Sequence, residues 1–390
     1  MFRRGGKFVG GDDNAFPSTN DDPEEAARKW KIWIDAESYR RMAAHLLIRD
    51  SQTSASLLIP PLVSFSESTC SLPASRTIWE AESASQWAHL MRSTMGSAHA
   101  KLPSVRSCLH DISLITASQP ALDVELAVQT VSNAFWGSCW QHRQVEAITK
   151  HTWDTLRQTN GLMANSAKQM TVQVLQQFRL LASEVHEARP EATMTSERVL
   201  MNLHVSLEDV QLLAGKAGEN EARRTFSTLK HWSKSSDSRQ ALWHAGQILK
   251  AARSFPARTL RDASAIAVYH AGLIFWAYAI LTNVDNDAKE ANTMHEIEIV
   301  LNEDNITHLE RFVMLGRGRP TIRWHDNPGR NKQPVSVPIR DARRVMKAIV
   351  DLLHVNNGLG DECPPLVDNL TKLMRSLGNA ARSIRAVDHT

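Results

Sequence analysis

Acidic and histidine-rich segments are the first candidates for chemistry, because carboxylates and imidazoles are the usual ligands of catalytic metals. Acidic clusters at residues 12–13 and 285–290 are of the kind that holds magnesium and a diphosphate in helical enzymes. The first cluster lies in a glycine-rich segment, and the second lacks the fuller Asn/Ser/Glu spacing. The HEIEI stretch at 295–299 has no second histidine at the zinc-protease position. The motifs therefore predict no metal site and no catalytic residues, and a helical enzyme remains only as an alternative.

Motifs for phosphate binding and nucleophilic catalysis are equally absent from the sequence. The GRGRP stretch at 316–320 lacks the lysine and the strand–helix context of a phosphate-binding loop, and the chain has no G-x-S-x-G elbow. The cysteines are far apart and form no C-x-x-C pair, which excludes a recognisable zinc finger or thioredoxin-like motif. They are Cys70, Cys108, Cys139 and Cys363.

A basic stretch at residues 311–347 is the one segment whose composition suggests a nucleic-acid partner. It contains ten Lys/Arg and two Asp, a local net charge of +8. Its RGRP sequence at 317–320 matches the core of an AT-hook, whose arginines enter a minor groove. A solvated basic loop is the alternative. The residues expected to contact DNA, through a weak electrostatic patch, are Arg317, Arg319, Arg323, Arg330 and Lys332.

The segment at residues 29–51 places two opposite charges on an apolar helical face. At about 100° per residue, Trp30, Glu37, Arg41 and Ile48 point in nearly the same direction. Glu37 and Arg41 are one turn apart, so they can pair along this face. We expect a buried or half-buried ion pair that fixes how the neighbouring helices dock.

The elements that must position these residues read almost entirely as helices, and strand signals are nearly absent. Residues 51–75 and 316–338 read as irregular connectors. We therefore expect an all-α, irregular multi-helix array, with a flexible head at residues 1–22 and one helical domain at 23–390. The predicted helices are 23–50, 76–95, 102–117, 120–135, 139–158, 165–188, 196–215, 219–233, 237–254, 257–283, 304–315, 338–355 and 365–384.

Composition limits the broad class of the protein. The chain is 42% hydrophobic and 22% charged, which is typical of a globular protein, and its net charge of +3 gives no strong overall field. The longest apolar run, residues 265–281, is about one turn short of a comfortable membrane span. We interpret it as a buried core helix, and we expect no membrane partner.

The tryptophan helix carries a resemblance to a known family. The pattern W-x-x-W-x-x-x-E-x-x-R-R, followed by an aliphatic run, resembles the fungal-specific transcription factor regulatory domain, the middle homology region of fungal zinc-finger regulators. Leu72-Pro73 and the I-W-E-A stretch at 78–81 continue the family pattern in order. The residues of this signature are Trp30, Trp33, Glu37, Arg40, Arg41, Trp79 and Trp87.

Later segments extend the resemblance over roughly residues 24–384. The stretches ALWHAGQIL at 241–249 and YHAGLIFWAY at 269–278 resemble the paired helices near the family's C-terminus. The CPPLVDNL stretch at 363–370 resembles the closing helix of the branch with an N-terminal two-Cys-two-His zinc-finger head. Trp79, Trp87, His244 and His270 are candidates for packing between helices or for lining a small-molecule cavity.

The resemblance implies a nuclear regulator of transcription, often of metabolic or secondary-metabolite genes, and no catalytic activity. This chain lacks the zinc-finger head, so we expect it to be part of a longer regulator, a shortened product or a variant without its own finger. Zinc is expected only in the missing head. Expected partners are DNA, the transcriptional machinery and a second copy in a homodimer. The alternative is a helical adaptor that reaches DNA through a finger-bearing partner.

Overall fold

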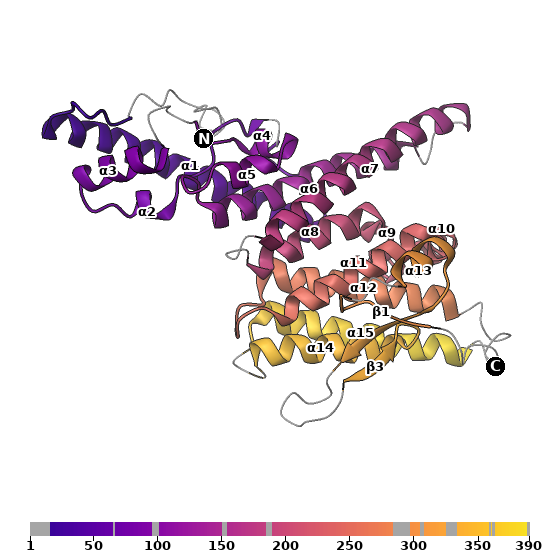
Figure 1. The fold of residues 1–390 in the computed structure, drawn as a ribbon. Coiled ribbons are helices and arrows are strands. Elements are labelled where there is room, and N and C mark those ends of the chain that lie inside the picture. The colour runs from indigo at the N-terminus through magenta and orange to yellow at the C-terminus, as the bar shows by residue number, and fades with distance from the viewer. Residues whose placement is uncertain are drawn as a thin grey trace. The chain divides into compact units, whose positions relative to one another are not determined.

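The computed structural model is predominantly α-helical, as the sequence predicts (Figure 1). Its contacts divide the chain into two compact units, Met1–Ala192 and Thr193–Thr390, and each unit is described by itself. The residues that the structure describes are 16–64, 67–95, 101–149, 154–184, 189–283, 297–304, 308–324, 334–358, 360 and 363–387.

Unit 1 is built on two long helices. Helix α1 packs against α6 and α3, and α6 packs against α7. An edge-to-face contact between Phe135 and Phe178, with ring centroids 5.7 Å apart, joins α6 to α7. The helices are α1 (Pro23–Leu57), α2 (Arg76–Trp79), α3 (Ala84–Met95), α4 (Val105–His110), α5 (Ser113–Ala117), α6 (Val124–Thr149), α7 (Asp154–Glu184) and α8 (Pro190–Leu203), which ends in unit 2.

Helix α1 has clear start and stop signals. Asp22 accepts a hydrogen bond from the backbone N–H of Glu25, and Pro23 occupies the first turn. The helix ends where Leu58 adopts a left-handed conformation with a φ of 56°. Asp21, in the expected head, forms an ion pair of 2.7 Å with Lys29. Residues 1–15 of that head lie outside the described residues.

Tertiary packing overrides two of the predicted boundaries in unit 1. Helix α1 continues to residue 57, where a connector is expected from residue 51, because its small residues bury against α6. Ser54 is 1% exposed and accepts a hydrogen bond of 2.7 Å from Trp136 Nε1. Helix α6 runs without a break where two helices are expected, since the buried Trp136 and Cys139 hold it through Gly137.

Unit 2 is organised around the apolar helix α12, which packs against α11, α14 and α15. This helix is long and apolar enough to cross a membrane, but 78% of its apolar window is buried within the protein. Trp276 Nε1 donates to the carbonyl of Leu377, 3.0 Å away, and ties α12 to α15. The helices are α9 (Leu207–Leu213), α10 (Glu219–Ser233), α11 (Ser236–Arg253), α12 (Asp262–Asn283), α13 (Leu309–Leu315), α14 (Ala342–Asn357) and α15 (Pro365–Val387).

A small three-stranded sheet corrects the expectation that residues 316–338 form an irregular connector. Strand β1 (Glu298–Val300) pairs in parallel with β2 (Arg319–Trp324), and β2 pairs antiparallel with β3 (Val335–Pro338). Part of the expected connector 316–338 therefore forms the central and third strands. The strands are short, and prolines at positions 320 and 338 conceal their alternating pattern.

The sheet docks against α11 through a close backbone approach. A Cβ on Gly246 would lie 2.3 Å from the carbonyl oxygen of Leu301, so no side chain fits at this position. Gln247 donates to the same carbonyl over 2.9 Å. In the HAGQ sequence of α11, the glycine therefore leaves room for the backbone that follows β1, and the glutamine donates a hydrogen bond to it.

Candidate functional site

The charged residues on the apolar face of α1 form a closed network in unit 1. Glu37 is fully buried. It accepts hydrogen bonds from Arg41 Nε at 3.0 Å, from Arg40 Nη1 at 3.2 Å and from the backbone N–H of Ala74 at 3.0 Å. Its carboxylate therefore joins α1 to the segment that follows Leu72-Pro73.

Arg41 extends the network to a third element. Its Nη1 lies 3.1 Å from Asp123 Oδ2, and its Nη2 donates to the carbonyl of Ala74 over 2.6 Å. Asp123 in turn caps α6, because its Oδ1 accepts from the backbone N–H of Leu126. One guanidinium thus holds together α1, residues 72–75 and the start of α6.

Three tryptophans cover this network. The ring of Trp33 lies 6.4 Å from that of Trp79 and 5.8 Å from that of the fully buried Trp87. The Arg41 guanidinium lies over Trp79, 5.0 Å from the ring centroid, in a cation–π contact. Trp30 is half-buried one turn earlier. The two halves of the sequence signature, on α1 and on α2–α3, therefore meet in space.

The electrostatics of the network suit a structural clamp. Burial raises the pKa of Glu37 to about 7, against the opposing effects of Arg40, Arg41 and the Ala74 N–H. Both carboxylate oxygens already accept hydrogen bonds. The pocket beside Arg40 has a volume of about 10 Å³, room for about one water molecule. A substrate therefore has no access to the Glu37 carboxylate through this pocket.

The histidines singled out from the sequence lie in the core of unit 2. His244 Nδ1 is 2.7 Å from Glu197 Oε2, and its ring stacks on that of His204 with centroids 5.9 Å apart. His204 pairs with Asp237 across 2.7 Å. His270 is 1% exposed, and burial lowers its pKa to about 3, so it is neutral. His244 therefore connects α11 to α8, and His204 connects the residue after α8 to the start of α11.

Three of the residues expected to contact DNA, Arg317, Arg319 and Arg323, lie in the described part of the basic stretch. Arg317 is exposed, but Arg319 begins β2 and its backbone N–H donates to Ile297. Arg323 forms an ion pair of 3.1 Å with Glu303. The backbone of 319–320 therefore belongs to a paired strand. Arg330 and Lys332 lie outside the described residues.

The sequence did not predict the partners that lie far along the chain, either in the Glu37–Arg41 network or in the cluster around His244. Asp123 and the Ala74 backbone complete the Arg41 network, and Glu197 pairs with His244. The sequence before α6 contained one usable signal, since an aspartate directly before an apolar helical run is a typical N-cap. Nothing local identifies Glu197 as the partner of His244.

Comparisons with known proteins agree with the family expected from the signature. A family model for the fungal specific transcription factor domain matches residues 10–160. Transcription factor 1 of Elsinoe fawcettii is 20% identical over 328 residues, which are 79% of this chain and 34% of that relative. The chain thus spans about a third of the length of this relative. No solved structure matches the chain.

Proposed function

We propose that this chain is the regulatory part of a fungal transcription regulator, because residues 10–160 match the family model for the fungal specific transcription factor domain. The observation that carries the proposal is the closed network of Glu37, Arg41 and Asp123. The acid and arginines of the signature are engaged in holding helices together, which leaves them unsuited to catalysis. We propose that the domain works by contact with other proteins of transcription.

Direct DNA contact is a further part of the proposal. Arg317, Arg343 and Arg344 are exposed in the basic stretch, and Arg319 is exposed at the start of β2. Contacts of this kind would be electrostatic, non-specific and sensitive to salt. Sequence-specific reading would come from a zinc-containing module elsewhere in a longer protein or from a partner protein.

The remaining parts of the proposal follow the resemblance. We place the protein in the nucleus, in control of a metabolic or secondary-metabolite gene set, and able to form a homodimer. Fluorescence microscopy of the tagged chain tests its location, transcript profiling after its deletion tests the gene set, and light scattering on the purified chain tests the homodimer.

A tethered reporter assay tests the proposed function. The full chain is fused to an unrelated DNA-binding module, and expression of a reporter carrying that module's binding site is measured. The proposal predicts that expression rises above or falls below the level given by the module alone. An unchanged level would reject a regulatory role.

A separate measurement distinguishes the regulator from the helical adaptor. The unfused chain is expressed in its host, and the proteins that co-purify with it are identified. If promoter occupancy depends entirely on a co-purifying finger-bearing protein, the chain acts as an adaptor. Occupancy that persists after removal of that protein would support a regulator with its own DNA contacts.

A further inference from the structure

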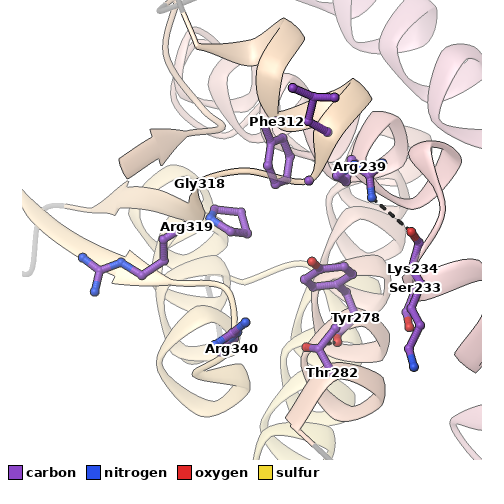
Figure 2. A pocket seen from close by; sticks show the side chains of 12 residues that line it. Ser233, Lys234, Arg239, Tyr278, Thr282, Phe312, Gly318, Arg319 and Arg340 are labelled. Carbon is purple, nitrogen blue, oxygen red and sulfur yellow. Dashed lines mark hydrogen bonds between the residues drawn. The ribbon is translucent and has the colours of Figure 1, made fainter. Parts of the chain in front are cut away.

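A pocket of about 370 Å³ lies in unit 2, where several elements converge (Figure 2). Its volume falls in the range of sites that hold small organic ligands. The walls come from the ends of α10 and α13, the start of α11, the C-terminal half of α12, the start of β2 and the segment before α14. The lining residues are Ser233, Lys234, Arg239, Tyr278, Thr282, Phe312, Leu315, Gly316, Gly318, Arg319, Pro320 and Arg340.

The lining has a strong excess of positive charge. It contains four Lys/Arg and no Asp or Glu. Figure 2 shows Lys234 and Arg340 on opposite sides of Tyr278 and Thr282, and both residues line the pocket. The side chain of Arg319 extends away from Tyr278 in this view and belongs to the rim.

Arg239 supplies a positive charge whose hydrogen-bond acceptors, within the part of the chain that the structure describes, are two neutral backbone carbonyls. Its Nε donates to the carbonyl of Val313 over 2.7 Å, and its Nη1 donates to the carbonyl of Lys234 over 3.1 Å. Burial lowers the pKa of this guanidinium, and the Tyr278 phenol opposes the shift. Two carbonyls orient the cation without neutralising it, which is the arrangement that a bound anion complements.

Glycine keeps one wall of the pocket close to this cation. Gly316 ends α13 with a φ of 66°, a conformation that favours glycine. A Cβ at Gly316 would lie 3.4 Å from Arg239 Nη1. The lining also contains an apolar part: Leu315 is 63% exposed and provides apolar surface, with the buried Phe312 behind it.

We propose that this pocket binds a small organic anion, with a phosphate or carboxylate group between Lys234, Arg239 and Arg340 and an apolar body against Leu315. The Tyr278 hydroxyl lies at the same pocket, while the Thr282 hydroxyl donates to the backbone carbonyl of Tyr278 over 2.7 Å. A concave site with separate charged and apolar parts fits a small molecule better than a DNA backbone, which presents phosphates along an extended surface. The inference goes beyond the proposed function and is tested by binding alone.

Calorimetric titration of the full chain tests the proposal at low salt with four probes. The probes are inorganic phosphate, phenyl phosphate, benzoate and neutral benzyl alcohol. We expect phenyl phosphate or benzoate to bind more tightly than inorganic phosphate, and benzyl alcohol to bind least. Lys234→Gln should weaken binding by about tenfold, because it removes one charged contact. The matched control Lys372→Gln, at an exposed residue outside the lining, should leave the affinity unchanged.

Several results would overturn the proposal. No binding of either organic anion would do so, as would equal affinity for benzyl alcohol or an equal loss in the Lys234 and Lys372 variants. A DNA duplex titrated in parallel provides the competing explanation. If only the duplex binds, and Lys234→Gln weakens it, the cations serve DNA contact and the small-anion site is wrong. Thermal unfolding of both variants confirms that each remains folded.

Discussion

Removing the Arg41 guanidinium should destabilise unit 1 more than any ordinary surface change. Arg41→Met keeps most of the side-chain length but removes the donors to Glu37, Asp123 and the Ala74 carbonyl. Glu37 and Asp123 are 0% and 7% exposed, so water cannot readily replace the lost donors. Breaking a buried ion pair on one side costs about 3–5 kcal/mol of unfolding free energy. For a unit of this size the loss corresponds to a fall of roughly 6–20 °C in Tm.

The assay is thermal unfolding at pH 8, followed by circular dichroism, with Arg49→Met as the control. Arg49 lies on the exposed face of the same helix. The control therefore makes the same Arg→Met substitution at a residue outside the Glu37–Arg41 network. The fall in Tm caused by Arg41→Met should be smaller at pH 5.5. At that pH Glu37 is protonated, so removing the cation leaves no buried negative charge unpaired at this position. An equal Tm for the two variants at pH 8 would refute the reasoning.

Three further predictions follow from the same structure. Glu37 takes up a proton on folding between its ordinary pKa of 4.5 and its folded value of about 7, so its contribution to stability falls as pH rises through this window. Glu37→Gln should remove that pH dependence in urea unfolding. Gly246→Ala should cost roughly 1–3 kcal/mol in the same assay, because its Cβ would overlap the Leu301 carbonyl. A double Arg317→Ala/Arg319→Ala change should weaken retention on DNA at low salt without lowering Tm.

Matched variants make each of these predictions refutable. Gly272→Ala places a Cβ 3.3 Å from the flexible end of Ile349, so it should cost less than the Gly246 change. If the unfolding free energy of the Glu37→Gln variant still falls as pH rises through this window, other titrating groups cause the pH dependence. If the double arginine variant is retained on DNA as strongly as the unmodified chain, neither Arg317 nor Arg319 contributes to DNA binding.

The local half of the Glu37–Arg41 network was predictable from sequence, because both residues lie on one helix at a spacing of four. Its other half was not. Asp123 is 82 positions from Arg41, and only the folded chain brings them together. The same limit applies to Glu197 and His244, which are 47 positions apart.

The predicted helix boundaries were wrong where tertiary packing contributes more to stability than the local helix preference of the residues. Ser51, Ser54 and Ala55 look like a connector in sequence, but their small size lets α1 approach α6. The sheet was missed because its strands have three to six residues and alternate only briefly. Its parallel pairing connects residues 298–300 with 319–321, a non-local contact without a local signal.

Reporter output of the tethered chain, compared between variants, tests most directly whether the domain held by this network regulates transcription. The unmodified chain and Arg49→Met should both shift expression away from the level of the DNA-binding module alone. Arg41→Met should lose that shift, since α1, residues 72–75 and α6 are no longer held together. An unmodified chain that leaves expression at the level of the module alone, or an Arg41→Met chain with full output, would contradict the central claim.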